Sequence, residues 1–157
     1  MMYTYEVNLK WSDKRKGMLS SPALPQNIEV ATPPEFPKGM EKIWSPEHLF
    51  VAAINSCLLT TFLSIAENSR LQFISFESKS TCNVDKINGK HTITEIILQP
   101  KLVIHYSQKA ERAKHILEMS EKACLISNAI KITIRLEPEI IIEYNLVPLG
   151  NSFKNSI

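Results

Sequence analysis

The sequence predicts an α+β fold in which antiparallel sheets wrap around a long, buried helix. Three observations support this class. Residues 3–11 alternate between apolar and polar side chains, as expected for a strand with one solvent-exposed face. Residues 49–65 are apolar or small on every side of a helix and carry no charge. Residues 76–106 hold two strand-like segments joined by Asn88-Gly89, a frequent hairpin turn.

Length and composition indicate one domain with an ordinary surface. The 157 residues are 44% hydrophobic and 22% charged, and the formal net charge is +2. Acidic and basic residues mix along the chain, which argues against nucleic acid and membrane surfaces as partners. The start does not resemble a leader, and no uninterrupted apolar run could cross a bilayer, so we expect a soluble, cytoplasmic protein. We assign residues 1–149 to one domain and residues 150–157 to a flexible tail.

The elements before the helix are short. The edge strand at residues 3–11 ends in a charged turn at residues 13–17. Two strand-like segments follow, at residues 18–20 and 28–31. The proline-rich stretch at residues 32–37 is expected to form an ordered loop or lid.

The long helix has a clear start signal. Ser45 is the expected N-cap, and Pro46 suits the first turn because its missing N–H has no partner there. The helix is predicted to end near Arg70. One domain of this size seldom hides such an apolar helix alone, so we expect a dimer.

The second half of the chain supplies a hairpin, a helix and closing strands. The returning strand of the hairpin, residues 93–106, is expected to break at Pro100. A second helix after Ser107 has one apolar stripe, made of Ala113, Ile116, Leu117, Ser120, Ala123 and Cys124. Closing strands are expected at residues 132–136 and 140–144, on either side of Pro138.

The three cysteines are too far apart in sequence to form a secretory disulfide framework or a recognisable zinc site. Cys57 lies in the middle of the buried helix, and Cys124 ends the stripe of the other helix. Packing of the two helices could bring these sulfurs together. Most buried cysteines are inert small hydrophobes, so a structural role remains open for both. Cys82, within a strand, is interpreted as structural.

Two charged residues are candidates for a site around a reactive thiol. A nearby cation lowers a thiol pKa, and Arg15 is the natural choice because its guanidinium stays charged. A solvent-exposed surface arginine is the alternative. Glu47 lies in the first turn of the long helix, where the helix dipole alone explains an acidic residue.

Three segments carry a resemblance to a known family. They are Arg15-Lys16-Gly17, the Ser45-Pro46-Glu47-His48-Leu49-Phe50 segment with the small residues up to Cys57, and Cys124-Leu125-Ile126-Ser127-Asn128-Ala129. With these segments and the same order of elements, residues 3–144 resemble the OsmC/Ohr family of organic hydroperoxide reductases. One departure is Leu125, which stands where the family usually has proline.

The resemblance implies roles for four residues. Cys57 would be the peroxidatic cysteine and Cys124 the resolving one, with Arg15 as the cation beside the thiolate and Glu47 as its salt-bridge partner. It further implies an intertwined homodimer with its sites at the subunit interface, an organic hydroperoxide substrate, and a dithiol reductant such as a dihydrolipoyl protein. No cofactor or metal is implied. Ten residues of helix place Glu47 roughly 15 Å from Cys57, so Glu47 is expected to act from the partner subunit.

Other functions remain open at this stage. A Cys–His hydrolase or acyl transferase would need a histidine at Cys57, and the choices are His48, His91, His105 and His115. A metal site built from Cys57, Cys124 and a histidine lacks closely spaced ligands. The stronger alternative is a non-enzymatic dimer of this fold that binds a hydrophobic ligand or senses oxidants. Four apolar residues would either line a substrate pocket or belong to the core: Phe36, Phe50, Leu58 and Phe62.

Overall fold

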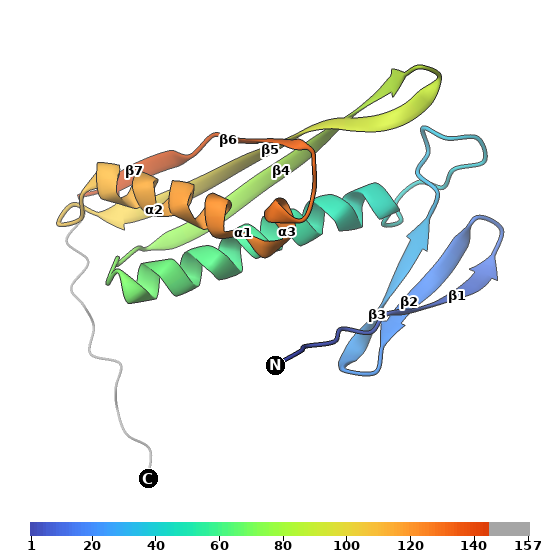
Figure 1. Ribbon diagram of the computed structural model, residues 1–157, viewed down its shortest axis with the longest axis horizontal. Helices are drawn as coiled ribbons and strands as arrows, with labels where there is room; N and C mark the ends of the chain where they lie inside the picture. Colours follow the sequence, from blue (N-terminus) through green and yellow to red (C-terminus); the bar gives the residue numbers. More distant parts are fainter. Residues whose placement is uncertain (145–157) are drawn as a thin grey trace, which may run out of the picture.

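A computed structural model describes residues 1–144, so the predicted tail at residues 150–157 lies outside the described residues (Figure 1). The described chain forms a small N-terminal sheet and a larger sheet covered by helices on one face. The elements in order are β1 (Asn8–Asp13), β2 (Lys16–Ser21), β3 (Leu24–Ala31), α1 (Pro46–Asn68), β4 (Ser75–Ile87), β5 (Lys90–His105), α2 (Ala110–Ala123), α3 (Leu125–Asn128), β6 (Thr133–Leu136) and β7 (Glu139–Glu143).

The N-terminal sheet is antiparallel in the order β1-β2-β3, with β1 at its edge as predicted. The predicted strand at residues 3–11 is wrong in two respects. It begins only at Asn8, and every residue of β1 is exposed, with Trp11 at 72%. A strand has one solvent-exposed face and one buried face only when another layer of structure packs against it. Within the described chain no layer packs against β1 (Figure 1).

The proline-rich stretch forms a hydrogen-bonded loop. The backbone N–H of Met40 donates to the carbonyl of Thr32 at 2.9 Å, and that of Gly39 donates to Phe36 at 2.9 Å. Gly39 is required by close approach, because a Cβ there would overlap the carbonyl oxygen of Pro33. The loop therefore holds Phe36 in a defined place before the start of α1.

The predicted start of α1 is confirmed. The Ser45 hydroxyl oxygen accepts the backbone N–H of His48 at 3.3 Å, and the backbone N–H of Ser45 donates to His48 Nδ1 at 3.4 Å. This reciprocal pair satisfies two N–H groups at the helix start. The helix ends at Asn68, and Arg70 then adopts a left-handed conformation with φ of 55°.

The prediction that α1 is buried all round is wrong for the single chain. Its fully buried residues recur every fourth position, so they form one stripe: Ile54, Leu58, Phe62 and Ala66. Other sides are open to solvent, and Leu63 is 43% exposed. The helix is long and apolar enough to cross a membrane by length and composition alone, but here it is a core helix that packs against α2 and β4.

The larger sheet has the order β4-β5-β6, with β7 also paired to β5. The α+β class, with antiparallel sheets and a long helix, is confirmed, since β4 and β5 pair antiparallel along their length. The sequence did not indicate that β6 and β7 both pair parallel with β5. The predicted break at Pro100 is wrong, because β5 runs through it. Pro100 falls between the stretch paired with β6, residues 95–98, and the stretch paired with β7, residues 101–105.

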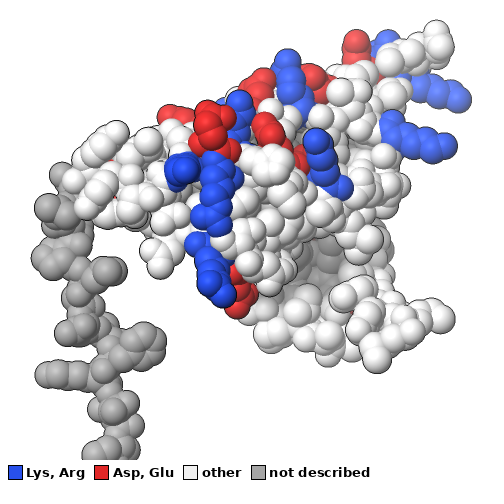
Figure 2. All heavy atoms as spheres, turned by 60° about the vertical axis from the view of Figure 1, so that its left-hand side comes forward, with Lys and Arg blue, Asp and Glu red and all other residues white. Residues whose placement is uncertain are grey.

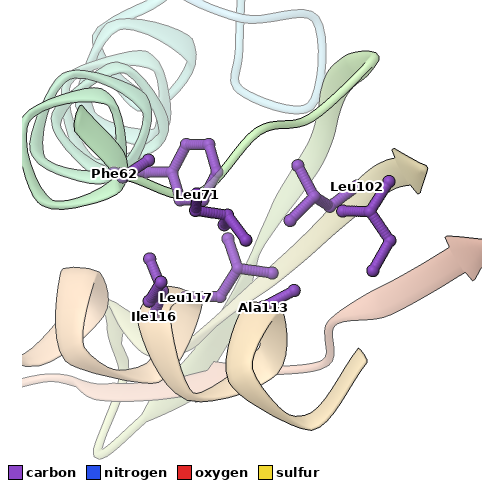
Figure 3. Close-up of a cluster of buried hydrophobic side chains, with 8 residues drawn as sticks. Phe62, Leu71, Leu102, Ala113, Ile116 and Leu117 are labelled. Carbon is purple, nitrogen blue, oxygen red and sulfur yellow. The ribbon is translucent and has the colours of Figure 1, made fainter. Parts of the chain in front are cut away.

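α2 lies beside α1 on the same face of the larger sheet and completes the core (Figure 1, Figure 3). The predicted stripe is buried except at Ala123, which is exposed because α2 ends there and the chain turns away. Cys124, with ψ of 119°, makes that turn and is fully buried. The cluster between the two helices and the sheet includes Phe62, Leu71, Leu102, Ala113, Ile116 and Leu117.

Charged side chains of both signs share the surface. On the face seen in Figure 2, Lys and Arg alternate with Asp and Glu over the upper part, while the lower part carries few charges and is hollowed. Elsewhere in the described chain, charges form ion pairs, as Lys16 does with Glu29 at 3.0 Å and Arg135 with Glu137 at 3.1 Å. This face therefore has no continuous surface of one sign.

Phe62→Ala is expected to lower the free energy of unfolding by about 3–5 kcal/mol, because it empties the centre of the cluster between α1 and α2. Urea unfolding at matched protein concentration measures the change. Met119→Ala, which removes a large side chain that is 43% exposed on α2, is the control and should cost far less. Equal losses in the two variants would contradict the assignment of this core.

Candidate active site

Cys57 and Cys124 meet between the middle of α1 and the end of α2. The two thiols lie close enough for each to shift the pKa of the other. Cys124 is fully buried, whereas Cys57 is half-buried. A reagent can therefore reach the Cys57 sulfur from solvent, and it would reach Cys124 only through movement of the chain.

Two sets of hydrogen bonds fix the elements that carry these cysteines. On α1, Asn55 Oδ1 accepts from the Ser78 hydroxyl at 2.6 Å, and Asn55 Nδ2 donates to the Ser78 carbonyl at 3.2 Å. This clamp to β4 sets the rotation of α1 two residues before Cys57. On the other side, the backbone N–H of Ser127 donates to Cys124 Sγ at 3.5 Å, so the Cys124 sulfur caps α3.

Opposing effects act on the Cys57 thiol. Burial raises its pKa, because a low-dielectric environment disfavours the anion. Hydrogen bonds to the sulfur outweigh burial and lower the pKa overall. They come from the Cys124 side chain, the backbone N–H of Ile126, the Thr61 hydroxyl and the backbone N–H of Leu125. The Thr61 Oγ1 atom, one turn along α1, lies 3.9 Å from Cys57 Sγ.

Cys124 shifts in the opposite direction. Burial raises its pKa, and the hydrogen bond with Cys57 raises it further, because that bond requires Cys124 to keep its proton. The contacts with Ser127 act the other way and are outweighed. The pair therefore combines an accessible Cys57 with a lowered thiol pKa and a buried Cys124 with a raised one.

Arg15 and Glu47 lie elsewhere in the single chain. Arg15 is exposed in the turn between β1 and β2, beside a cavity of about 300 Å³ that Pro46 also lines. Glu47 lines a different cavity, of about 690 Å³. Neither residue contributes to the environment of Cys57, and among residues 1–144 the two do not form an ion pair. Their predicted roles beside Cys57 stay predictions.

The larger cavity contains an unsatisfied carboxylate. Its walls come from the loop before α1, the first turns of α1, β4 and the hairpin, and include Phe36, Trp44 and Val51. The Oε2 atom of Glu47 is buried there without a hydrogen-bond partner among the described residues. Burial and the charge of Glu47 raise the pKa of the Cys82 thiol on the same wall. These effects disfavour a thiolate at Cys82, and its interpretation as structural stays a prediction.

The other apolar residues and the histidines considered from the sequence have neighbours away from Cys57, with Phe36 alone of the four apolar residues lining the large cavity. Leu58 and Phe62 are fully buried core residues, and Phe50 packs against the core, so only Phe36 of the four lines the large cavity. Each histidine has a neighbour away from Cys57: Ser45 for His48, Phe36 for His91, Ser107 for His105 and Glu118 for His115. Among residues 1–144, no three His, Cys, Asp or Glu side chains are grouped to hold a metal ion.

Comparison with protein families identifies the fold. The model of the family described as OsmC-like protein matches residues 39–139, about two thirds of the chain. The chain belongs to the OsmC-like family. This OsmC-like protein is similar to a Bacillus subtilis protein, "Uncharacterized protein YmaD", with 25% identity over 142 residues that cover 86% of this chain and 91% of the relative.

Solved structures share the fold. The chain is similar to an OsmC-like protein of unknown function from Vibrio cholerae, with a TM-score of 0.78 and 23% identity, over 87% of this chain and 99% of that one. It is also similar to the organic hydroperoxide resistance protein OhrB of Bacillus subtilis, with a TM-score of 0.66 and 17% identity, over 88% of this chain and 98% of that one. At these identities the likeness establishes the fold alone.

Sequence reasoning missed three groups around Cys57 of this OsmC-like protein. Thr61 could have been found, because residues four apart on a helix lie on the same side. The N–H groups of Leu125 and Ile126 left no sequence signal, because nearly every residue type carries one. They depend on how the chain turns after Cys124.

Thr61→Val is expected to raise the pKa of Cys57, because it removes a hydroxyl donor while keeping the shape of the side chain. The pH dependence of Cys57 alkylation by iodoacetamide, in a Cys82→Ser background, measures the change. Thr60→Val is the matched control, since the Thr60 hydroxyl donates to the carbonyls of Ser56 and Cys57 and not to the sulfur. A profile that moves equally in both variants would rule out the Thr61 hydroxyl as a donor.

Proposed function

We propose that this protein is a thiol-dependent peroxidase that reduces organic hydroperoxides to alcohols. The observation that carries the proposal is the cysteine pair. An accessible Cys57 has a lowered pKa, and it touches a buried Cys124 with a raised pKa. A peroxide-reducing site needs a thiolate as nucleophile and a second thiol within reach of the product. The fold shared with organic hydroperoxide resistance proteins supports the same chemistry.

The reaction follows from these two protonation states. The Cys57 thiolate attacks one oxygen of the hydroperoxide, the O–O bond breaks, and the leaving alkoxide takes up a proton to become the alcohol. Cys57 is then a sulfenic acid. The Cys124 thiol attacks the Cys57 sulfur, a disulfide forms, and the hydroxyl leaves as water. A dithiol reductant, for which a dihydrolipoyl protein is our candidate, returns both thiols and is itself oxidised to a disulfide.

We further propose that the active form is a homodimer in which Arg15 and Glu47 of one subunit serve the Cys57 of the other. Glu47 supports this, because a buried carboxylate oxygen without a partner is costly and calls for a cation or donor from outside the described chain. The exposed sides of α1 and the uncovered strand β1 support it too, since both present apolar side chains to solvent.

The proposed substrate preference rests on the large cavity. Its volume of about 690 Å³ suits a small organic molecule, and Phe36, Trp44 and Val51 would contact an alkyl or aryl group. In the proposed dimer, Glu47 would bring this cavity next to the partner's thiolate. The second candidate function, a non-enzymatic dimer that binds a hydrophobic ligand, is favoured by the same cavity and is separated from the first by turnover.

Cumene hydroperoxide is expected to oxidise the reduced protein much faster than hydrogen peroxide does, because each buried CH₂ contributes about 0.8 kcal/mol, roughly fourfold in rate. Stopped-flow fluorescence measures both rates, and mass spectrometry identifies the Cys57–Cys124 disulfide. Cys57→Ser should abolish the reaction, and Cys124→Ser should stop it at the sulfenic acid. Cys82→Ser is the control and should react as wild type. Slow oxidation without preference would instead favour the ligand-binding function.

Mixed dimers test whether Glu47 acts across the interface. Homodimers of Glu47→Gln should be weak, and those of Cys57→Ser inactive. Co-refolding equal amounts should restore about a quarter of wild-type turnover, because half of the dimers are mixed and each mixed dimer has one complete site of two. A cis arrangement would restore nothing. A monomer by light scattering at micromolar concentration would also reject the shared site.

A further inference from the structure

One wall of the large cavity is closed by a contact between two elements that are far apart in the sequence. Phe36 lies in the loop before α1, and His91 lies near the tip of the hairpin formed by β4 and β5. Figure 1 shows this loop beside the end of the hairpin. The two ring centroids are 4.8 Å apart with an interplanar angle of 67°, an edge-to-face arrangement that aromatic rings prefer. Both rings line the cavity of about 690 Å³.

The backbone of the loop holds Phe36 in this contact. The N–H of Phe36 donates to the carbonyl of Pro33 at 3.1 Å, and the N–H of Gly39 donates to the carbonyl of Phe36 at 2.9 Å. At the base of the loop, the N–H of Thr32 donates to the carbonyl of Arg15 at 3.2 Å. A molecule in the cavity would have to break these hydrogen bonds to displace the backbone that carries Phe36.

The register of the hairpin holds His91 on the other side of the contact. His91 pairs with Lys86, close to the turn at Asn88 and Gly89. Both turn residues have positive φ, 50° and 78°, which is the geometry of a tight two-residue hairpin turn. Ile87, in the same part of the hairpin, is 45% exposed and does not line the cavity. The hairpin therefore contributes His91, and not Ile87, to the wall.

We propose that Phe36 and His91 are specificity-determining residues that limit the size of the alkyl or aryl group this cavity accepts. This inference rests on the proposed function and deepens it, because the group in the cavity would be that of the hydroperoxide. An apolar chain gains roughly fourfold in affinity per CH₂, but only while each added CH₂ is removed from water. Once the chain reaches the paired rings, further CH₂ groups stay in solvent. The pair thus sets the chain length at which affinity stops rising.

The test uses the alcohol products of alkyl hydroperoxides, from n-butanol to n-decanol, as probes. The chain has two tryptophans, and Trp44 lines the cavity, so the fluorescence of Trp44 in a Trp11→Phe background reports binding. Phe36→Ala and His91→Ala should each raise the ratio of the n-decanol affinity to the n-butanol affinity by at least about fourfold, the gain for one more buried CH₂. A ratio is used because it cancels any loss of affinity common to all alcohols.

Two matched variants serve as controls. His91→Phe keeps an aromatic ring in the contact, and Ile87→Ala shortens a side chain of the same hairpin outside the cavity. Both should keep the wild-type ratio. An unchanged ratio in either Phe36→Ala or His91→Ala, or an equal rise in Ile87→Ala, would overturn the proposal. Failure of the wild type to bind any of the alcohols would overturn it as well.

The binding test is independent of the proposed reaction, because alcohols need no peroxide chemistry to bind. A raised ratio in the two alanine variants of a protein without turnover would reject the peroxidase function and keep this inference. Turnover of hydroperoxides with an unchanged ratio would keep the peroxidase function and reject this inference.

A second measurement covers the case in which the alanine variants do not fold. In wild-type protein, nuclear Overhauser effects locate the terminal methyl group of the longest alcohol whose affinity still exceeds that of the next shorter one. This methyl group should lie against the ring protons of Phe36 and His91. A methyl group in contact with neither ring would overturn the proposal.

Discussion

The packing of α1 against α2 is the interaction on which the rest of the site depends. Phe62 of α1 is buried with Leu117 of α2 in one cluster, and the i to i+4 stripe of α1 continues from it to Leu58 and Ile54. This contact fixes the distance between the helices, so that Cys57 lies beside the end of α2. The Asn55–Ser78 clamp then sets the rotation of α1. Without these contacts, two sulfurs 67 residues apart in sequence would have no reason to meet.

The proximity of Cys57 and Cys124 separates the chemistry of the two cysteines. Burial alone raises both pKa values and would leave two inert thiols. Their proximity acts in opposite directions, because Cys124 lowers the pKa of Cys57 and Cys57 raises the pKa of Cys124. Further groups around Cys57 lower its pKa enough to outweigh burial, whereas the contacts of Cys124 with Ser127 do not outweigh its burial. A nucleophile and a resolving thiol therefore arise from two identical side chains through placement alone.

Much of this arrangement could be predicted from the sequence, where local rules decide it. The Ser45 cap and the positions of Cys57 and Cys124 on two helices follow from capping preferences and helical periodicity. The N–H donors at Leu125 and Ile126 could not be predicted, because they depend on a turn and not on residue type. The continuity of β5 through Pro100 could not be predicted either. It depends on long-range pairing, because β6 pairs with β5 before Pro100 and β7 pairs with β5 after it.

The wrong expectations for the burial of β1 and of α1 share one physical cause, which bears on the proposed dimer. β1 was expected to have one covered face and α1 to be buried on every side, and both are partly bare in the single chain. Those expectations came from apolar patterns, which report burial in the working state of the protein. The buried Glu47 oxygen also lacks a hydrogen-bond partner among the described residues, just as the apolar faces of β1 and α1 lack a covering layer. We infer that one second copy would cover the apolar faces and satisfy the carboxylate, because separate remedies for each would require three independent partners.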